Sequence, residues 1–372
     1  MKVLIFSLTY HPFIGGAEVA VKEITDRISD ISFDMITVDL DGEQKTEEKI
    51  GNVNVYRVGN SKKSKYFFPF RASAIAKKLH QKNHYDAVWA IMANQAGLAA
   101  LFFKKKNPKV PFLLTLQEGD SEFDIWLRTF YMRPLYKSIY TKADYIQAIS
   151  HFLANRARSL GAKCAVEVVP NGIDNEKVLQ ARQSQYQKFD KLIITSSRLV
   201  KKNAVDVIIK ALALLGDKEI RLNILGDGIL RKELEELVKN LKLENRVKFF
   251  GHVADFEVYA QINAAKIFIR PSRSEGLGIA FLEAMSLGVA VIATSVGGIP
   301  DFLEDGETGV FCKVDDPKDL AEKIELLLTE ESLYKKISEN SKNLIVEKYQ
   351  WTGIVSRIKN IFSEITKKLQ TL

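Results

Sequence analysis

Short apolar runs alternate along the whole chain with segments whose apolar residues recur every three or four positions. A short apolar run predicts a buried strand, and the three-or-four spacing predicts a helix that buries one face. Ala17, Ala20, Val21, Ile24 and Ile28 form such a stripe soon after the first run. Strands that alternate with helices favour parallel sheets built from βαβ units. The runs that predict strands in the first half are KVLIFSL, FDMITVDL, VNVYRV, DAVWAI, PFLLTL, DYIQAIS and VEVVP.

The alternation stops over residues 175–191, which are rich in Gln and Lys, and then starts again. Residues 205–215 and 230–241 have the apolar spacing of helices. We therefore expect a second doubly wound domain from about residue 190. Residues 351–372 predict a last helix with one apolar stripe, made of Ile354, Ile358, Ile361, Phe362 and Ile365. The runs that predict strands in this half are KLIITSSRL, RLNILGDG, VKFFGH, KIFIRPS, VAVIATS and GVFCKV.

The composition is that of an ordinary globular protein, with 46% apolar and 27% charged residues among 372. Cys164 and Cys312 lie far apart without a CxxC spacing, which argues against a disulfide framework and a zinc cluster. The first apolar run is too short for the core of a signal peptide. The apolar stretch 96–103 is much shorter than the roughly 20 residues of a membrane-spanning helix. We expect a cytoplasmic protein that does not cross a membrane.

The net charge of +8 is concentrated in one part of the chain, because residues 51–170 hold 19 Lys and Arg against 7 Asp and Glu. Such a region is either a solvated basic face or a surface that attracts lipid headgroups or nucleic acid. Aromatic residues interleave with cations in KKSKYFFPFR and WLRTFYMRPLYK, but no nucleic-acid motif is present. We therefore favour an anionic membrane surface, with Phe67, Phe68 and Phe70 as interfacial contacts. The alternative is that these aromatic residues pack inside the domain.

Candidate chemistry should lie at strand ends, because open α/β sheets bind ligands beyond the carboxyl ends of their strands. Gly15 and Gly16 follow the first strand and open a helix, where backbone N–H groups can approach an anion closely. Glycines needed only for a tight turn would give the same pattern. Gly226 and Gly228 also follow a strand, but Arg231 occupies the third position of a dinucleotide fingerprint. We infer that these two glycines allow close backbone packing beside a nucleotide base.

A group of cations follows the first strand of the second domain. Arg198, Lys201 and Lys202 precede a helix that is expected to start near Ala204. Cations are electrostatically disfavoured at the amino end of a helix, so a negative group should compensate them. A diphosphate fits, because arginine offers a planar fork to phosphate oxygens and lysine a point charge. The alternative is a solvated basic loop.

Two carboxylates lie eight positions apart in RSEGLGIAFLEAMSLG, residues 273–288. Glu275 precedes a helix expected from Gly278 onward, and Glu283 lies inside it. A fully helical stretch would separate them by roughly 12 Å, comparable to a diphosphate with parts of its flanking sugars. Glu283 could then accept two ribose hydroxyls and Glu275 could hold the sugar. In the alternative interpretation, Glu283 pairs with a lysine, and Glu275 is a first-turn carboxylate that the helix dipole favours.

The stretch SEGLGIAFLEAMSLGVAVIATSVGGIPDFLEDGETGVF, residues 274–311, closely resembles the donor-site signature of the family 4 glycosyltransferases. The motifs RLV, VVPNGID, GDG, FFGHV and GGAE are also similar to that family, and the resemblance covers nearly the whole chain. It implies the GT-B fold, in which two doubly wound Rossmann-like domains face each other across a cleft. The domains would be 1–172 on the acceptor side and 190–350 on the donor side, joined by 173–189. The helix 351–372 would cross back onto the first domain.

The resemblance also implies roles for individual residues. Arg198 and Lys202 would neutralise the leaving diphosphate, Glu275 would contact the donor sugar and Glu283 the ribose. The donor-binding residues expected are Gly15, Gly16, Arg198, Lys202, Gly226, Val253, Glu275, Leu277, Gly278 and Glu283, and among them Arg198, Lys202 and Glu275 would serve catalysis. Cations and N–H dipoles aimed at the departing phosphate would stabilise the transition state without a metal.

The implied activity is retaining transfer of a hexose from a nucleotide-diphosphate sugar to a hydroxyl acceptor. No cofactor or metal is expected beyond the co-substrate, which would be a UDP- or GDP-sugar rather than an ADP-sugar. The acceptor would be a glycan or a lipid-linked glycan, at the inner face of a membrane, and no nucleic acid is expected. The rival readings are another GT-B enzyme, such as a nucleotide-sugar epimerase, and a basic membrane or nucleic-acid binding module without catalysis.

The chain departs from the family pattern in three places. Asn203 and Ala204 stand where many members have lysine and glycine, which leaves Lys202, or Lys201, as the phosphate lysine. Gln117 stands where many members have histidine, and its amide could bind a sugar hydroxyl while Asp120 orients the acceptor. Ser197 replaces a common glycine and changes little.

Overall fold

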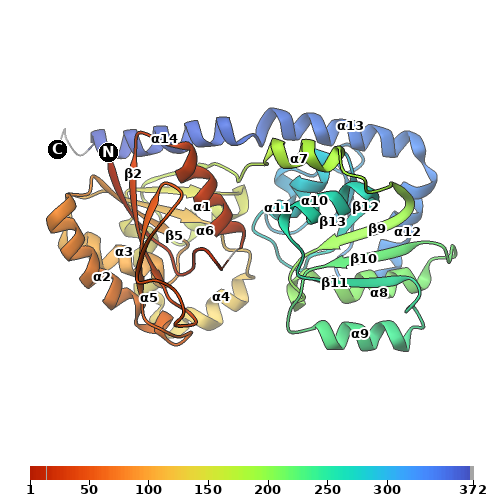
Figure 1. The fold of residues 1–372 in the computed structure, drawn as a ribbon, viewed down its shortest axis with the longest axis horizontal. Coiled ribbons are helices and arrows are strands. Elements are labelled where there is room, and N and C mark those ends of the chain that lie inside the picture. Colours follow the sequence, from red (N-terminus) through yellow and green to blue (C-terminus); the bar gives the residue numbers. More distant parts are fainter. Residues whose placement is uncertain (14, 369–372) are drawn as a thin grey trace. The chain divides into compact units, whose positions relative to one another are not determined.

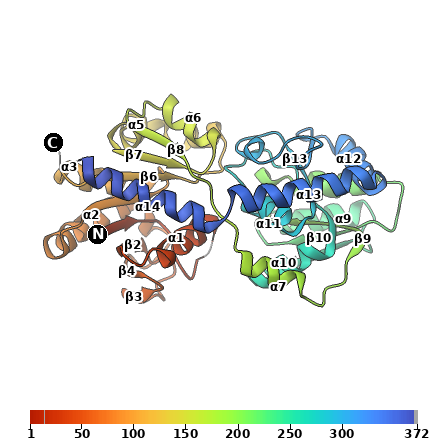
Figure 2. The same ribbon diagram turned by 90° about the horizontal axis from the view of Figure 1, so that it is seen from above.

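The computed structural model describes residues 1–13 and 15–368. It divides the chain into two compact units, one formed by Met1–Asn171 with Trp351–Leu372 and one by Gly172–Gln350. Figures 1 and 2 show that each unit is a sheet with helices on both of its faces. The prediction of two doubly wound α/β domains is confirmed.

The first unit is built on an eight-stranded sheet in the order β3-β4-β2-β1-β5-β6-β7-β8. All neighbouring strands pair in parallel except β3 and β4, which are antiparallel. Strand β3 was not predicted, because its residues EEKI are mostly charged and half-exposed at the sheet edge. The strands are β1 (Lys2–Phe6), β2 (Ser32–Val38), β3 (Glu47–Ile50), β4 (Val53–Val58), β5 (Ala87–Ile91), β6 (Phe112–Leu116), β7 (Tyr145–Ala148) and β8 (Ala165–Val168).

Both faces of this sheet are covered, so the central strands are apolar throughout. Val3 and Ile5 of β1 pack with α1 and α14, whereas Phe6 lies 6.3 Å from Phe103 of α3, measured between ring centroids. The stripe of α14 is buried in the core that includes Val3 and Ile5, as predicted, and residues 369–372 of the predicted helix lie outside the described residues. The helices are α1 (Gly16–Arg27), α2 (Ser64–Asn83), α3 (Gln95–Lys106), α4 (Glu122–Thr129), η1 (Phe130–Met132), α5 (Arg133–Lys142), α6 (His151–Ser159) and α14 (Trp351–Lys368).

The second unit is built on a fully parallel sheet in the order β11-β10-β9-β12-β13-β14. The six runs that predict strands in this half all form strands. They are β9 (Phe189–Ser196), β10 (Arg221–Leu225), β11 (Val247–Gly251), β12 (Ala265–Arg270), β13 (Ala290–Thr294) and β14 (Val310–Cys312). Residues 173–189 contain a helix, α7 (Asn175–Arg182), which buries Val178 and Ala181 within this unit.

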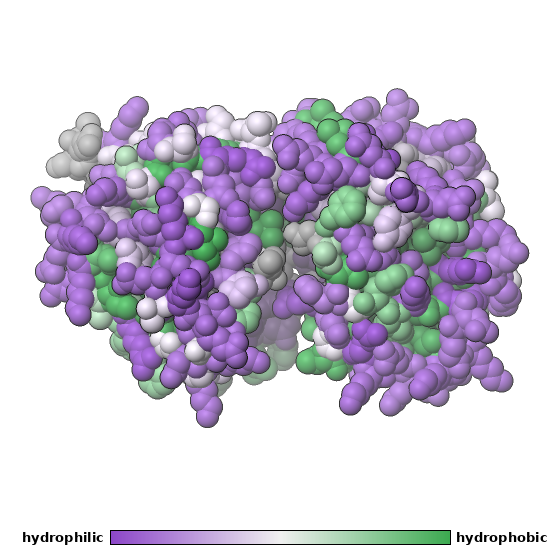
Figure 3. Space-filling model, in the orientation of Figure 1, coloured by the Kyte–Doolittle hydropathy of each residue, from purple (hydrophilic) through white to green (hydrophobic). Residues whose placement is uncertain are grey.

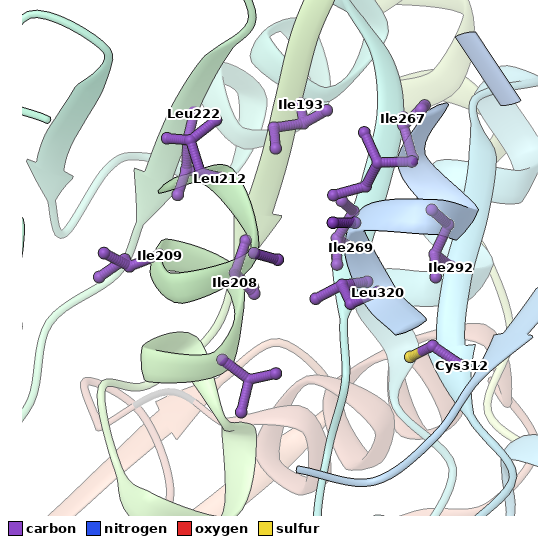
Figure 4. Packing of buried hydrophobic residues seen from close by; sticks show 14 of the residues in the cluster. Ile193, Ile208, Ile209, Leu212, Leu222, Ile267, Ile269, Ile292, Cys312 and Leu320 are labelled. Atoms are coloured by element: carbon purple, nitrogen blue, oxygen red, sulfur yellow. The ribbon is translucent and has the colours of Figure 1, made fainter. Parts of the chain in front are cut away.

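The core of the second unit lies between its sheet and the helices α8 and α12. Figure 4 shows Ile193, Ile267, Ile269 and Ile292 of the strands beside Ile208 of α8 and Leu320 of α12. These residues fix the strands, and therefore the loops at the strand ends. The remaining helical segments are η2 (Lys201–Asn203), α8 (Val205–Leu214), α9 (Arg231–Asn240), α10 (Asp255–Ala264), α11 (Ile279–Leu287), η3 (Ile299–Asp301), α12 (Pro317–Thr329) and α13 (Glu331–Lys348).

The aromatic residues of α2 divide between the surface and the core. Phe67 and Phe70 are exposed, but Phe68 is fully buried. The prediction that Phe68 contacts a membrane is therefore wrong, because its ring lies on the buried face of α2. Within the described part of the chain, no helix combines the length and the apolar character needed to cross a bilayer.

Candidate functional site

The predicted donor residues of the second unit lie at one edge of its sheet, where the parallel strands end. The loops that follow β11, β10, β9, β12 and β13 occur there in that spatial order. Hydrogen bonds join each of these loops to the next, as described below. Residues far apart in the sequence are thus held in one structure at the sheet edge where ligands bind in open α/β folds.

Two glycines let the loops after β9 and β10 approach each other at backbone distance. Leu199 N donates to Asp227 O at 2.9 Å, and Ser197 N donates to Leu225 O at 3.0 Å. A Cβ on Gly226, whose φ is +110°, would lie 2.1 Å from Ser197 O, and one on Gly228 would lie 2.5 Å from Leu199 O. No other residue fits there without moving the backbone. The close packing inferred from the sequence is present, and contact with a nucleotide base stays a prediction.

The loop after β11 joins the same structure. Gly226 N donates to Gly251 O at 2.7 Å. Val253 follows two residues later and is half-buried. Its predicted role in donor binding remains a prediction.

The cationic loop after β9 is held in shape by a residue that departs from the family pattern. Asn203 is buried, and its Nδ2 donates to Arg198 O at 2.7 Å. Ala204 has a φ of +53°, in the left-handed region that glycine adopts most easily. The side chains of Arg198 and Lys201 are exposed, and neither forms an ion pair with a described residue. Lys202 is half-buried in the short turn η2.

Arg273 fastens this cationic loop to the loop after β12. Its backbone N donates to Lys202 O at 2.7 Å, and its Nη1 donates to Lys201 O. The guanidinium also forms ion pairs with Asp206 at 3.1 Å and Asp315 at 2.7 Å. Arg273 was not among the predicted site residues, because its partners lie on other elements of the fold, including α8, which carries Asp206.

Arg270 binds the carboxylate that was predicted to hold the sugar. Its Nη2 pairs with Glu275 Oε2, and the two side chains are only 9% and 13% exposed. The guanidinium also lies 4.4 Å from the ring centroid of Phe281. Arg270 was not among the predicted site residues, although a charge at the end of the apolar run KIFIRPS signals a buried partner.

The backbone of Glu275 is fixed as well as its side chain. Gly276 N donates to Glu275 Oε1 at 3.1 Å, and Gly298 N, beyond β13, donates to Glu275 O at 3.2 Å. A Cβ on Gly297 would lie 1.9 Å from Glu275 O. The loop after β13 thus contacts the backbone of Glu275 directly.

Helix α11 begins at Ile279, one residue later than predicted, with Gly278 as its N-cap at a φ of +86°. Leu277 is buried, and a Cβ on Gly278 would lie 2.6 Å from Arg270 Nη2. Glu283 is half-buried on a helix whose other residues are mostly buried. The separation of roughly 12 Å derived for a fully helical stretch does not apply, because residues 275–278 are not helical.

Several buried polar atoms at this sheet edge have no hydrogen-bond partner among the described residues. They belong to the ends of β9 and β12 and are Thr195 Oγ1, Ser197 Oγ, Arg270 Nε and Ser272 Oγ. Buried polar atoms are nearly always hydrogen-bonded in folded proteins. These four atoms therefore keep hydrogen-bonding capacity that a polar ligand or ordered water could satisfy.

The glycines predicted to meet the diphosphate lie at the start of α1 in the first unit. Gly15 is the N-cap in extended conformation, and its added Cβ would lie 2.7 Å from Glu18 Oε2. An added Cβ on Gly16 would meet nothing within 4 Å. Glu18 is buried and accepts a hydrogen bond from Thr9 Oγ1. The packing around position 16 therefore leaves room for a side chain. The role of Gly16 toward a phosphate stays a prediction.

The predicted acceptor residues follow β6 in the first unit. Gln117 Oε1 accepts from Asn171 Nδ2 at 3.2 Å, and Asp120 pairs with Arg128 at 2.5 Å. Between them, Glu118 accepts a hydrogen bond from Ala93 N, and burial raises the pKa of its carboxyl. Glu118 thus holds the turn after β5 in place, a role that was not predicted from the sequence. The acceptor roles of Gln117 and Asp120 remain predictions.

Among residues 1–13 and 15–368, no group of three or more His, Cys, Asp or Glu side chains is arranged to hold a metal ion. Metal-independent action remains a prediction.

Cys164 and Cys312 are free thiols. Burial raises the pKa of the Cys164 thiol to about 11 and that of Cys312 to about 12, so both are protonated at neutral pH.

Two family models match consecutive parts of the chain. The model described as Glycosyltransferase Family 4 matches residues 14–177, and the model described as Glycosyl transferases group 1 matches residues 178–344. The chain belongs to the family 4 glycosyltransferases. An uncharacterized glycosyltransferase of Methanocaldococcus jannaschii is 28% identical over 98% of this chain and 99% of its own length.

Solved structures of glycosyltransferases share the fold of this family 4 member. Sucrose-phosphate synthase of Thermosynechococcus elongatus has a TM-score of 0.84 at 18% identity and covers 99% of both chains. HepE of Anabaena, solved in complex with UDP and glucose, has a TM-score of 0.78 at 20% identity over 98% of this chain and 100% of its own. The predicted GT-B fold is confirmed.

Proposed function

We propose that this glycosyltransferase moves a hexose from a nucleotide-diphosphate sugar to a hydroxyl acceptor, with retention of configuration and without a metal ion. The acceptor in this proposal is a glycan or a lipid-linked glycan, and the reaction takes place in the cytoplasm. A UDP- or GDP-sugar is the donor. The complex of HepE with UDP and glucose supports a nucleotide-sugar donor for a protein of the same fold.

One observation carries the proposal. The loop with Arg198, Lys201 and Lys202 is fastened by Arg273 to the loop with Glu275, at the carboxyl edge of a single sheet. The charges of Arg270 and Arg273 are compensated by Glu275, Asp206 and Asp315. Arg198 and Lys201 are exposed and form no ion pair with a described residue, so they are free to meet an anionic ligand.

These cations would act on the leaving group. Breaking the bond between the sugar and the diphosphate develops negative charge on the departing phosphate and positive character on the sugar. Cations already held in place stabilise that charge without later rearrangement. The departing phosphate would accept the proton of the acceptor hydroxyl, so no side-chain base is needed. Glu275, held by Arg270, would bind the sugar, and Glu283 the ribose.

The test is a transfer assay with UDP-, GDP- and ADP-sugars, run with and without EDTA. We expect Arg198→Ala and Glu283→Ala each to lower kcat/KM about a hundredfold, as loss of one preorganised donor does in other enzymes. EDTA should leave the rate unchanged, and the product should keep the anomeric configuration of the donor.

Arg221→Ala is the matched control, because Arg221 is an exposed arginine at the opposite, amino end of β10. It should turn over normally. Near-normal turnover of both Arg198→Ala and Glu283→Ala with every nucleotide sugar would refute the site. Formation of an epimerised nucleotide sugar without acceptor would favour the epimerase reading instead.

A further inference from the structure

Helix α2 presents an aromatic and basic face that nothing in the described part of the chain covers. Tyr66, Phe67 and Phe70 are 63%, 61% and 65% exposed. The opposite face of the helix is buried through Phe68, Ala72 and Ala76. Aromatic rings of this size are usually buried. Their exposure on an otherwise well-packed helix marks a surface for an external partner.

The charges around these rings all have the same sign. Residues 59–85 contain seven Lys and Arg and no Asp or Glu. Lys63, Arg71, Lys77 and Lys78 are exposed, and none forms an ion pair with a described residue. At 100° per residue, these four side chains lie on the same side of the helix as Phe67 and Phe70. The face is therefore both apolar and uniformly cationic.

The end of α3 adds to this face. The ring of Phe70 lies 5.5 Å from that of Phe102, measured between centroids. Lys105 and Lys106 follow Phe102 by about one helical turn and are exposed. Figure 2 shows α2 and α3 side by side, and Figure 3 shows apolar surface among hydrophilic side chains in the region that α2 occupies in Figure 1.

A second exposed aromatic group, on α4 and η1, has a different charge environment. Phe123 stacks on Trp126 at 6.2 Å, and both are exposed. Along this segment Glu122 and Asp124 precede Arg128, which is already paired with Asp120. The α4 group thus has no cationic excess, and of the two exposed aromatic groups it is the α2 face that is complementary to an anionic surface.

We propose that the face formed by Lys63, Phe67, Phe70, Arg71, Lys77 and Lys78 binds the surface of an anionic lipid bilayer. The cations attract the headgroups, and the two phenylalanine rings enter the interface. The proposal adds a membrane partner to the proposed function, since a lipid-linked acceptor would be presented at such a surface. It does not depend on the identity of the nucleotide or the sugar.

The test is flotation of the full chain with vesicles of phosphatidylcholine containing phosphatidylglycerol, and with vesicles of phosphatidylcholine alone. We expect binding only to the anionic vesicles, and loss of that binding at high salt. Lys77→Glu with Lys78→Glu should weaken binding at low salt by at least about tenfold. Phe67→Ser with Phe70→Ser should weaken binding to the same vesicles because the apolar insertion is lost.

Controls separate this proposal from loss of folding and from the donor site. Phe123→Ser with Trp126→Ser, on α4, should float like the wild type. All variants should keep the wild-type melting temperature and its shift with nucleotide sugars, so failure of the membrane proposal and failure of the proposed function can be told apart. Absence of flotation at low salt, equal flotation of the α2 variants, or binding of RNA or DNA in its place would overturn the proposal.

Discussion

At the scale of single residues, the candidate site depends on a buried pair of opposite charges. Arg270 and Glu275 lie in contact, largely removed from water, with the guanidinium also over Phe281. A buried charge is costly without its partner, so each of these residues fixes the position of the other. The carboxylate of Glu275 is therefore held in a single orientation.

Arg270→Met should lower the free energy of unfolding by about 3 kcal/mol, because it leaves the Glu275 carboxylate buried and unpaired. The double variant Arg270→Met with Glu275→Gln should lose less, since neither buried charge remains. Urea denaturation of both single variants and the double variant measures this coupling. Losses that simply add would contradict the pairing.

The sequence predicted some of these residues and not others. Arg198, Glu275 and Glu283 stand in motifs at strand ends, where spacing alone identifies them as candidates. Arg270 and Arg273 act through partners that only the fold brings near, and no local pattern encodes Asp206 or Asp315 as neighbours of Arg273.

At the scale of helices and strands, glycines set how closely the loops of the second unit approach. Gly226 and Gly228 lie against the backbone of the cationic loop, and Gly297 lies against Glu275. Larger residues there would separate loops that must act together. The geometry of the predicted phosphate site thus depends on residues that carry no functional group.

Gly226→Ala should cost about 2 kcal/mol or more of stability, because the added Cβ meets Ser197 O and the φ of +110° is strained for alanine. Gly216→Ala is the matched control, since its Cβ would meet nothing within 4 Å. That variant should change stability by no more than about 0.5 kcal/mol. Thermal unfolding compares the two variants, and equal melting temperatures would contradict the close backbone approach of the loops after β9 and β10.

Apolar strands were predicted well at this scale, because strands covered on both faces read as continuous apolar runs. The edge strand β3 was missed, since EEKI carries no such signal. The start of α11 was placed one residue early, because Gly278 is compatible with both a cap and a first helical turn.

At the scale of the whole molecule, the chain combines two doubly wound units that carry different charge patterns. The second unit concentrates its candidate donor residues at one sheet edge, where Arg198 and Lys201 remain exposed. The first unit contains most of the basic excess, including the α2 face. The net charge alone predicted neither site, since it does not show which cations are compensated.

The central claim is that the cationic loop of the second unit binds the diphosphate of a nucleotide sugar. Melting temperatures of the wild type, Arg198→Ala and Arg221→Ala with UDP, GDP and ADP test it most directly, because a ligand that binds the folded state raises the melting temperature. The account predicts a rise with UDP or GDP for the wild type and Arg221→Ala, and at least about tenfold weaker binding by Arg198→Ala. No rise with any nucleotide, or an Arg198→Ala response equal to the wild type, would contradict it.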